Sequence, residues 1–196
     1  MGIASTLSAV RSQHRPLLRF IGKVVAVYGV WYLLYDLWLL PDGRLDRWVS
    51  LSVVQVGEFV LNLAGFEPGV SARRLVLPGT PGIRVVDGCN GLASIGLFVG
   101  FVVAFPGRAR RRAAFIPLGI LVVFLSNVAR VTGLLLLQKY WDAGFQAAHS
   151  IGAPIFFYTV IFGLWVIWTN HGGSASSTSD PDDASDPDDQ TRPAFA

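Results

Sequence analysis

The chain has 196 residues, of which 52% are hydrophobic and 15% are charged. Because soluble domains carry about 25% charged residues, this composition excludes an ordinary soluble domain and indicates one membrane-embedded domain. The single cysteine excludes an internal disulfide and a zinc cluster built on cysteine pairs. The net charge is +3, and the charged residues are gathered in a few clusters. Such clusters orient a membrane protein and do not indicate nucleic-acid binding. We expect neither a cofactor nor a metal.

The first apolar run extends from Leu17 to Leu40 and follows a basic N-terminal segment. It is longer than the apolar core of a cleaved signal peptide and lacks a small-residue cleavage site, so we expect a retained transmembrane helix. Asp36, inside its outer end, is expected to face water or to pair with an arginine. Aromatic residues that fit an outer interfacial belt are Trp31, Tyr32, Tyr35 and Trp38.

The segment from Asp46 to Phe66 combines a polar stripe at helical spacing with an apolar face. This pattern favours a helix that lies in the membrane interface, or lines a polar cavity, over one surrounded by lipid. Two short extended pieces follow, Arg74 to Leu77 and Ile83 to Val86, joined by a turn rich in Pro and Gly. They predict a hairpin-like loop that presents Cys89 from a tethered position.

Three apolar runs follow Cys89, at about 91–105, 113–137 and 149–169. The first is short for a span, so its helix is expected to begin at Asn90 or before and to end near Pro106. Glycines at 91, 96 and 100 favour close approach of neighbouring helices. The predicted fold is therefore an all-α membrane protein of four transmembrane helices plus one interfacial amphipathic helix, over residues 1–171. Residues 172–196, with six aspartates between Asp180 and Asp189, are expected to form a disordered acidic tail.

Four spans place the basic N-terminus, the loop of Arg108 to Arg112 and the acidic tail on one side of the membrane. The positive-inside rule makes that side the cytoplasm, so we expect a multi-pass protein of the cytoplasmic membrane with both termini inside. Five arginines would then lie outside, which counts against this orientation, although long loops contribute less to the rule. They are Arg44, Arg47, Arg73, Arg74 and Arg84.

This orientation places Cys89 at the outer end of the second span and His149 at the outer start of the fourth. Arg130 lies in the third span, about two turns before its outer end, so we expect all three side chains to face one external pocket. A guanidinium within a span costs about 2.5–3.5 kcal/mol even on the mild insertion scale, so Arg130 should point into the bundle and bind something. Asn127 lies one turn earlier on the same face. It is available to hold Arg130 or a substrate carbonyl.

Three motifs in order carry a resemblance: Cys89-Asn90-Gly91, then Asn127-Val128-Ala129-Arg130, then His149-Ser150-Ile151-Gly152 at the start of the final helix. Over about residues 74–168, the chain resembles the exosortase/archaeosortase family in its compact, core-only form. The resemblance implies a membrane cysteine protease or transpeptidase with Cys89, Arg130 and His149 as catalytic residues. Its substrates would be exported proteins with a C-terminal sorting signal, namely a short motif, a transmembrane helix and a basic cluster. The cleaved protein would pass to a cell-surface acceptor.

The chemistry is consistent with these residue types. A thiol becomes a strong nucleophile on deprotonation, which a neighbouring cation or base promotes. His149 would take the thiol proton and later protonate the leaving amine, while Arg130 would stabilise the oxyanion. Supporting or substrate-binding roles are predicted for Asn127, Asn90, Gly91 and Glu58.

Other readings remain open at this point. Free cysteines are usually buried and inert, a histidine at a span boundary is often interfacial, and Arg130 could form a salt bridge to Glu58 or Asp36. Two other functions are also compatible with the sequence: a small transporter component in which Arg130 binds an anion, and a non-catalytic assembly protein of the cell envelope. The Arg108 to Arg112 cluster is read as a topological anchor that meets membrane lipids.

Overall fold

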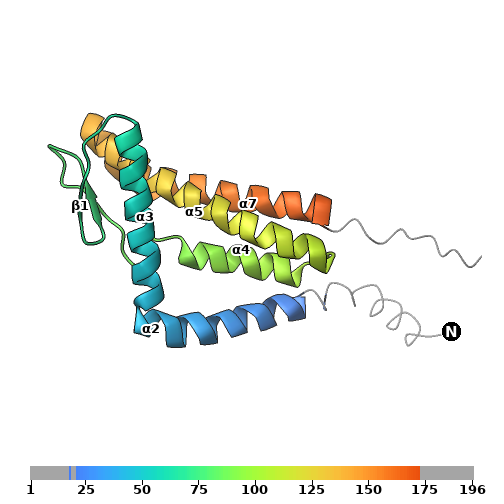
Figure 1. The fold of residues 1–196 in the computed structure, drawn as a ribbon. Coiled ribbons are helices and arrows are strands. Elements are labelled where there is room, and N and C mark those ends of the chain that lie inside the picture. Colours follow the sequence, from blue (N-terminus) through green and yellow to red (C-terminus); the bar gives the residue numbers. More distant parts are fainter. Residues whose placement is uncertain (1–17, 19–20, 173–196) are drawn as a thin grey trace, which may run out of the picture.

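The computed structural model describes residue 18 and residues 21–172, and it is mostly helical (Figure 1). The N-terminal helix, Ile21–Asp42, ends in a π-helical stretch η1 (Tyr32–Leu39) and one turn α2 (Leu40–Asp42). The helix α3 (Arg44–Leu63) precedes a small sheet, and α4 (Leu92–Ala104) and α5 (Ala109–Tyr140) follow it. A last helix, Asp142–Gly172, contains α6 (Asp142–Ala147), π-helical η2 (Ala148–Gly152) and α7 (Ala153–Gly172).

Three of these helices are long and apolar enough to cross a membrane: Ile21–Asp42, Ala109–Tyr140 and Asp142–Gly172. The fourth predicted span, α4, has 13 helical residues and therefore extends only about 20 Å at 1.5 Å per residue. The prediction that it begins at Asn90 or before is wrong. Gly91 takes a left-handed conformation (φ +86°), so the helix starts at Leu92, and it ends where extended Phe105 precedes a proline.

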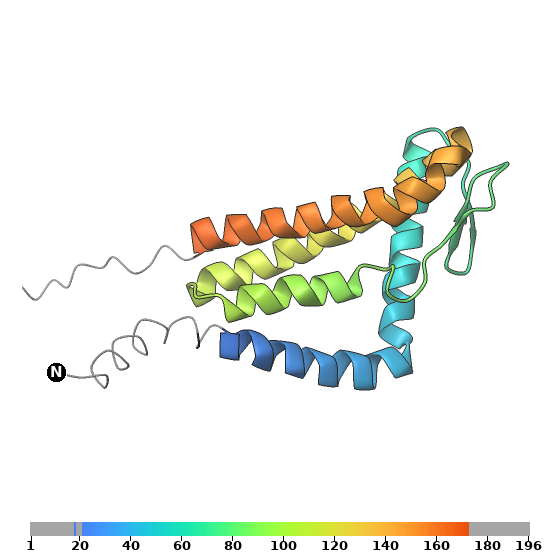
Figure 2. The same cartoon turned by 180° about the vertical axis from the view of Figure 1, so that it is seen from behind.

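The helix α3 lies across one end of the bundle formed by the N-terminal helix, α4, α5 and α7 (Figures 1 and 2). Its buried residues recur at helical spacing and include Val49, Val53, Val54 and Leu61. With 20 residues the helix is long enough to span a membrane, but its composition is not that of a spanning helix, and its direction differs from that of the helices that qualify (Figures 1 and 2). Both observations agree with the expected interfacial helix.

The loop before Cys89 forms an antiparallel sheet of three strands in the order β1 (Gly69–Ser71), β2 (Arg74–Val76), β3 (Ile83–Arg84). The predicted hairpin corresponds to β2 and β3, whose register pairs Leu75 with Ile83; β1 was not anticipated. The sheet is attached to the bundle because the Gly82 amide donates to Gln138 Oε1 on α5 at 3.1 Å.

Two larger apolar cores and a smaller third one hold the molecule together, and the third joins the N-terminal helix, α3 and α4 through Tyr35, Val49 and Leu92. The first joins α3, the sheet and α5, with Val53, Val54, Leu75 and Leu135 fully buried. The second lies between α4, α5 and α7 and is formed by Phe98, Val102, Val123, Phe157, Ile161, Leu164 and Trp168. Two glycines permit the closest contacts around it: a Cβ on Gly96 would overlap the ring of Trp31, and one on Gly119 would overlap that of Phe98. The close approach expected at Gly96 is thus confirmed.

The two ends of the bundle differ. The α4–α5 loop, the start of the N-terminal helix and the end of α7 lie at one end, while α3, the sheet, the turn before α4 and α6 lie at the other (Figures 1 and 2). The two ends of the described chain thus lie at the same end of the bundle (Figures 1 and 2). The N-terminal Arg11, Arg15 and Arg19, and the predicted acidic tail from residue 173 onward, lie outside the described residues.

Close packing of α4 against α5 predicts opposite effects for two glycines of one helix. Gly119→Ala should lower the apparent unfolding temperature in detergent, because overpacking a fixed ring costs about 1–3 kcal/mol. Gly133→Ala is the matched control, since its Cβ would meet nothing within 4 Å and Ala is favoured over Gly in a helix by about 1 kcal/mol. Equal midpoints for the two variants would contradict the packing described.

Candidate active site

The turn that carries Cys89 is fixed by glycines and by main-chain hydrogen bonds. Gly88 and Gly91 both have positive φ (+83° and +86°), a conformation that residues with a Cβ rarely adopt. The Cys89 amide donates to the Val86 carbonyl at 2.9 Å. Arg73 on the sheet forms an ion pair with Asp87. The half-buried free thiol is therefore presented by a constrained turn between the sheet and α4.

Asn90, predicted to bind substrate or to support the site, makes its side-chain hydrogen bonds to other residues of the protein. Its side chain is 1% exposed. Nδ2 donates to Asp46 Oδ1 at 2.7 Å and to the Asp46 carbonyl at 3.3 Å, and Oδ1 accepts from the Leu92 amide at 3.0 Å. Both ends of this amide hold the turn in place, so its role is support.

Asn127 joins the turn to α5. It is fully buried, and its Nδ2 donates to the Cys89 carbonyl at 3.2 Å. A Cβ at Gly91 would lie 3.4 Å from the Asn127 Cβ, so the glycine lets the turn approach this side chain closely. Asn127 Oδ1 is buried without a hydrogen-bond partner among the described residues.

Arg130 lies one turn after Asn127 on α5 and is half-buried. Its Nε is buried and has no hydrogen-bond partner within the described part of the chain. The ion pairs found there are Arg44–Asp42 and Arg73–Asp87, so the salt bridge of Arg130 to Glu58 or Asp36 considered above is not formed. The charge of Arg130 is left available for a ligand. The helix continues to Tyr140, so Arg130 lies nearly three turns before its end.

His149 is exposed and stacks on Phe145, with ring centroids 5.8 Å apart. It does not open the final helix as expected, because that helix begins at Asp142 and His149 falls within π-helical η2. Short π-helical stretches are rare and often occur at functional sites. In residues 21–172, no hydrogen bond joins His149 to Cys89 or Arg130. The structure thus brings the Cys89 turn together with the helix that bears Arg130. It places the helix that carries His149 at the same end of the bundle (Figure 1).

The remaining predicted supporting residue, Glu58, is half-buried on α3 and has no side-chain hydrogen bond or ion pair within the described chain. Sequence reasoning missed Asp46, which is fully buried next to the turn. A signal was present, because Asp46 shares a helix face with Val49 and Val53 at spacings of three and seven residues. An acidic side chain on an otherwise apolar face should have been expected to have a buried partner.

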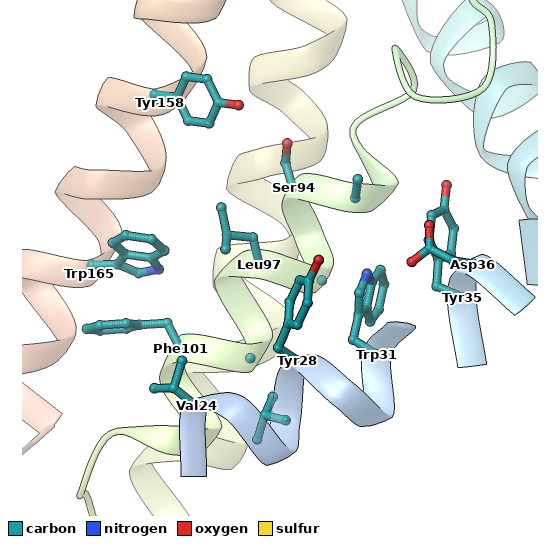
Figure 3. Close-up of a pocket in the computed structure, with 14 residues that line it drawn as sticks. Val24, Tyr28, Trp31, Tyr35, Asp36, Ser94, Leu97, Phe101, Tyr158 and Trp165 are labelled. Atoms are coloured by element: carbon teal, nitrogen blue, oxygen red, sulfur yellow. The ribbon is translucent and has the colours of Figure 1, made fainter. Parts of the chain in front are cut away.

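A cavity of about 440 Å³ lies between the N-terminal helix, α4 and α7 (Figure 3). Tyr28, Trp31 and Asp36 of the N-terminal helix line one wall, and Leu97 and Trp165 face them from α4 and α7. Asp36 therefore faces this cavity and forms no ion pair with an arginine of the described chain. The three predicted catalytic residues do not line it. It reaches the first turn of α4 at Ala93 and Ser94, directly after the Cys89 turn.

Fold and site together define a helical membrane protein with a free thiol in a tethered turn. The turn packs against a helix whose Arg130 forms no ion pair within the described residues. A family model described as transmembrane exosortase matches residues 7–166, and the chain belongs to this family. Membership implies a membrane protein of the cysteine peptidase or transpeptidase type. No curated protein and no solved structure matches the chain.

The hydrogen bond from Asn127 to the turn predicts a change in thiol accessibility. Asn127→Ala should accelerate maleimide labelling of Cys89, the one cysteine of the chain, about fivefold, because a typical hydrogen bond contributes about 1 kcal/mol. Ser126→Ala is the matched control, since Ser126 donates to the Val122 carbonyl of its own helix at 2.8 Å. If labelling rates of the two variants agree, Asn127 does not hold the turn.

Proposed function

We propose that this protein cleaves C-terminal sorting signals of exported proteins and transfers the cleaved proteins to a cell-surface acceptor. The observation that carries the proposal is the contact between the Cys89 turn and Asn127, which brings the thiol beside the helix that carries Arg130. The unpaired Nε of Arg130 supports a role for the guanidinium in binding the substrate carbonyl.

In the proposed reaction, His149 takes the proton of the Cys89 thiol, and the thiolate attacks the carbonyl carbon of the scissile peptide bond. Arg130 stabilises the oxyanion that forms. The C–N bond then breaks, the leaving amine takes a proton from His149, and the substrate remains attached as a thioester. An acceptor nucleophile, deprotonated by His149, attacks this thioester and regenerates the thiol. His149 is exposed and forms no hydrogen bond with Cys89 or Arg130. In this proposal, the bound substrate lies between the three side chains and brings them to bear on the same peptide bond.

The substrate proposed here ends in a short motif, a transmembrane helix and a basic cluster. The apolar cavity between the N-terminal helix, α4 and α7 supports this choice, because it adjoins the Cys89 turn and is bounded by helices. Only 6% of the N-terminal helix's apolar window is buried within the molecule, so this wall leaves apolar surface for a partner helix. We place the site on the outer face of the cytoplasmic membrane, with both termini in the cytoplasm.

Arg130 also supports a second candidate, a transporter component in which its guanidinium binds an anion. The two functions differ in what they require of Cys89. Transport by Arg130 would survive replacement of the thiol, whereas thioester chemistry would not.

The proposed function is tested by expressing the chain with a tail-anchored substrate encoded in the same genome and following removal of its C-terminal helix. Cys89→Ala should abolish processing. Arg130→Ala should slow it by about 10²–10³, the usual loss for one oxyanion donor, and His149→Ala by about 10²–10⁴.

Two variants serve as matched controls and should process substrate at the wild-type rate. His171→Ala removes an exposed histidine near the end of α7, and Arg84→Ala removes an exposed arginine of the sheet. Processing that survives Cys89→Ala would disprove the cysteine mechanism.

A further inference from the structure

A buried carboxylate sits directly behind the Cys89 turn. Asp46 is fully buried in the first turn of α3, and its Oδ1 accepts from Tyr35 Oη at 3.0 Å and from Asn90 Nδ2 at 2.7 Å. Its main-chain carbonyl accepts from the same Asn90 amide at 3.3 Å. One residue thus ties together the N-terminal helix, α3 and the residue next to Cys89.

We propose that Asp46 is the positioning residue of the active site, which acts through Asn90 to hold the Cys89 sulfur where it can attack. This inference rests on the proposed function and adds to it a residue that does not touch the substrate. Tyr35 is the second anchor, and it fixes the carboxylate from the N-terminal helix.

The geometry of Asn90 explains how the effect reaches the thiol. Asn90 stands between Cys89 and Gly91, and its side chain binds Asp46 on one side and the Leu92 amide on the other. The carboxylate therefore sets the point at which the turn ends and α4 begins. Loss of this anchor allows the main chain to move at Asn90, the residue directly after the nucleophile Cys89. A displacement of about 1 Å at a reacting group can cost about 100-fold in rate.

The burial of Asp46 is difficult to explain by stability alone. A carboxylate withdrawn from water is costly unless its hydrogen bonds are complete, yet Asp46 Oδ2 has no partner among the described residues. An aspartate in the first turn of a helix interacts favourably with the helix dipole, but that interaction does not require burial. The contacts of Asp46 with Asn90 hold the Cys89 turn, and its contact with Tyr35 joins α3 to the N-terminal helix.

The test compares four variants of the full chain in detergent: Asp46→Ala, Asn90→Asp, the exchange Asp46→Asn with Asn90→Asp, and Ser50→Ala. Asn90→Asp places two carboxylates against each other, whereas the exchange restores one amide and one carboxylate. Ser50→Ala is the matched control, because Ser50 is also fully buried on α3 and its Oγ has no hydrogen-bond partner among the described residues. For each variant we would measure kcat and KM for substrate cleavage, the maleimide labelling rate of Cys89, and the unfolding midpoint.

With kcat normalised to the folded fraction, Asp46→Ala should lower it about 10- to 100-fold, with KM changed less than threefold. Its labelling rate should rise severalfold, because the turn loosens. Asn90→Asp should lower kcat to a comparable degree. The double variant that exchanges the two residues should have a kcat at least tenfold above that of Asn90→Asp, and Ser50→Ala should behave as wild type.

The role of Asp46 would be overturned if folded Asp46→Ala had the kcat and labelling rate of the wild type. It would also be overturned if the double exchange had a kcat no higher than that of Asn90→Asp. If Asp46→Ala does not fold, Tyr35→Phe tests the same anchor by removing only one hydroxyl and should lower kcat. Wild-type kcat and labelling in that variant would contradict the proposal. If the wild-type chain itself cleaves no substrate, the proposed function fails, while the labelling rates still decide whether Asp46 holds the turn.

Discussion

The site depends on the hydrogen bond that Asn127 donates to the Cys89 carbonyl from inside α5. Because Asn127 is fully buried, this bond forms only where the turn lies directly against the helix, and Gly91 supplies the necessary space. The same helix packs on α3, α4, α7 and the sheet. The position of the Cys89 turn is therefore tied to the helix that contributes to the two larger apolar cores.

The positions of the helices and of the hairpin could be predicted from the sequence, since apolar periodicity and the Pro- and Gly-rich turn are local signals. The transmembrane exosortase family was also recognisable, from Cys89, Arg130 and His149 in order. The meeting of Asp46 with Asn90 could not be predicted. The two residues are 44 positions apart, and no periodic pattern encodes a contact between a helix and a distant turn.

Two errors in the expected boundaries have local causes. The start of α4 is delayed because Gly91 takes a left-handed conformation, which stops the helix despite the apolar run around it. The final helix begins earlier than expected because Asp142, in its first turn, favours a helix N-terminus. Residues 142–148 are only weakly apolar, so they lie outside the apolar run that marks the rest of this helix.

The shortness of α4 determines the depth of the nucleophile. With the arginine loop at one face of the lipid layer, a helix of 13 residues ends about 10 Å short of the opposite face of a hydrocarbon layer about 30 Å thick. The Cys89 turn contacts α5 at Asn127, whereas α5 continues to Tyr140. In the proposed reaction, a peptide bond has to reach this level along α5 before it can react.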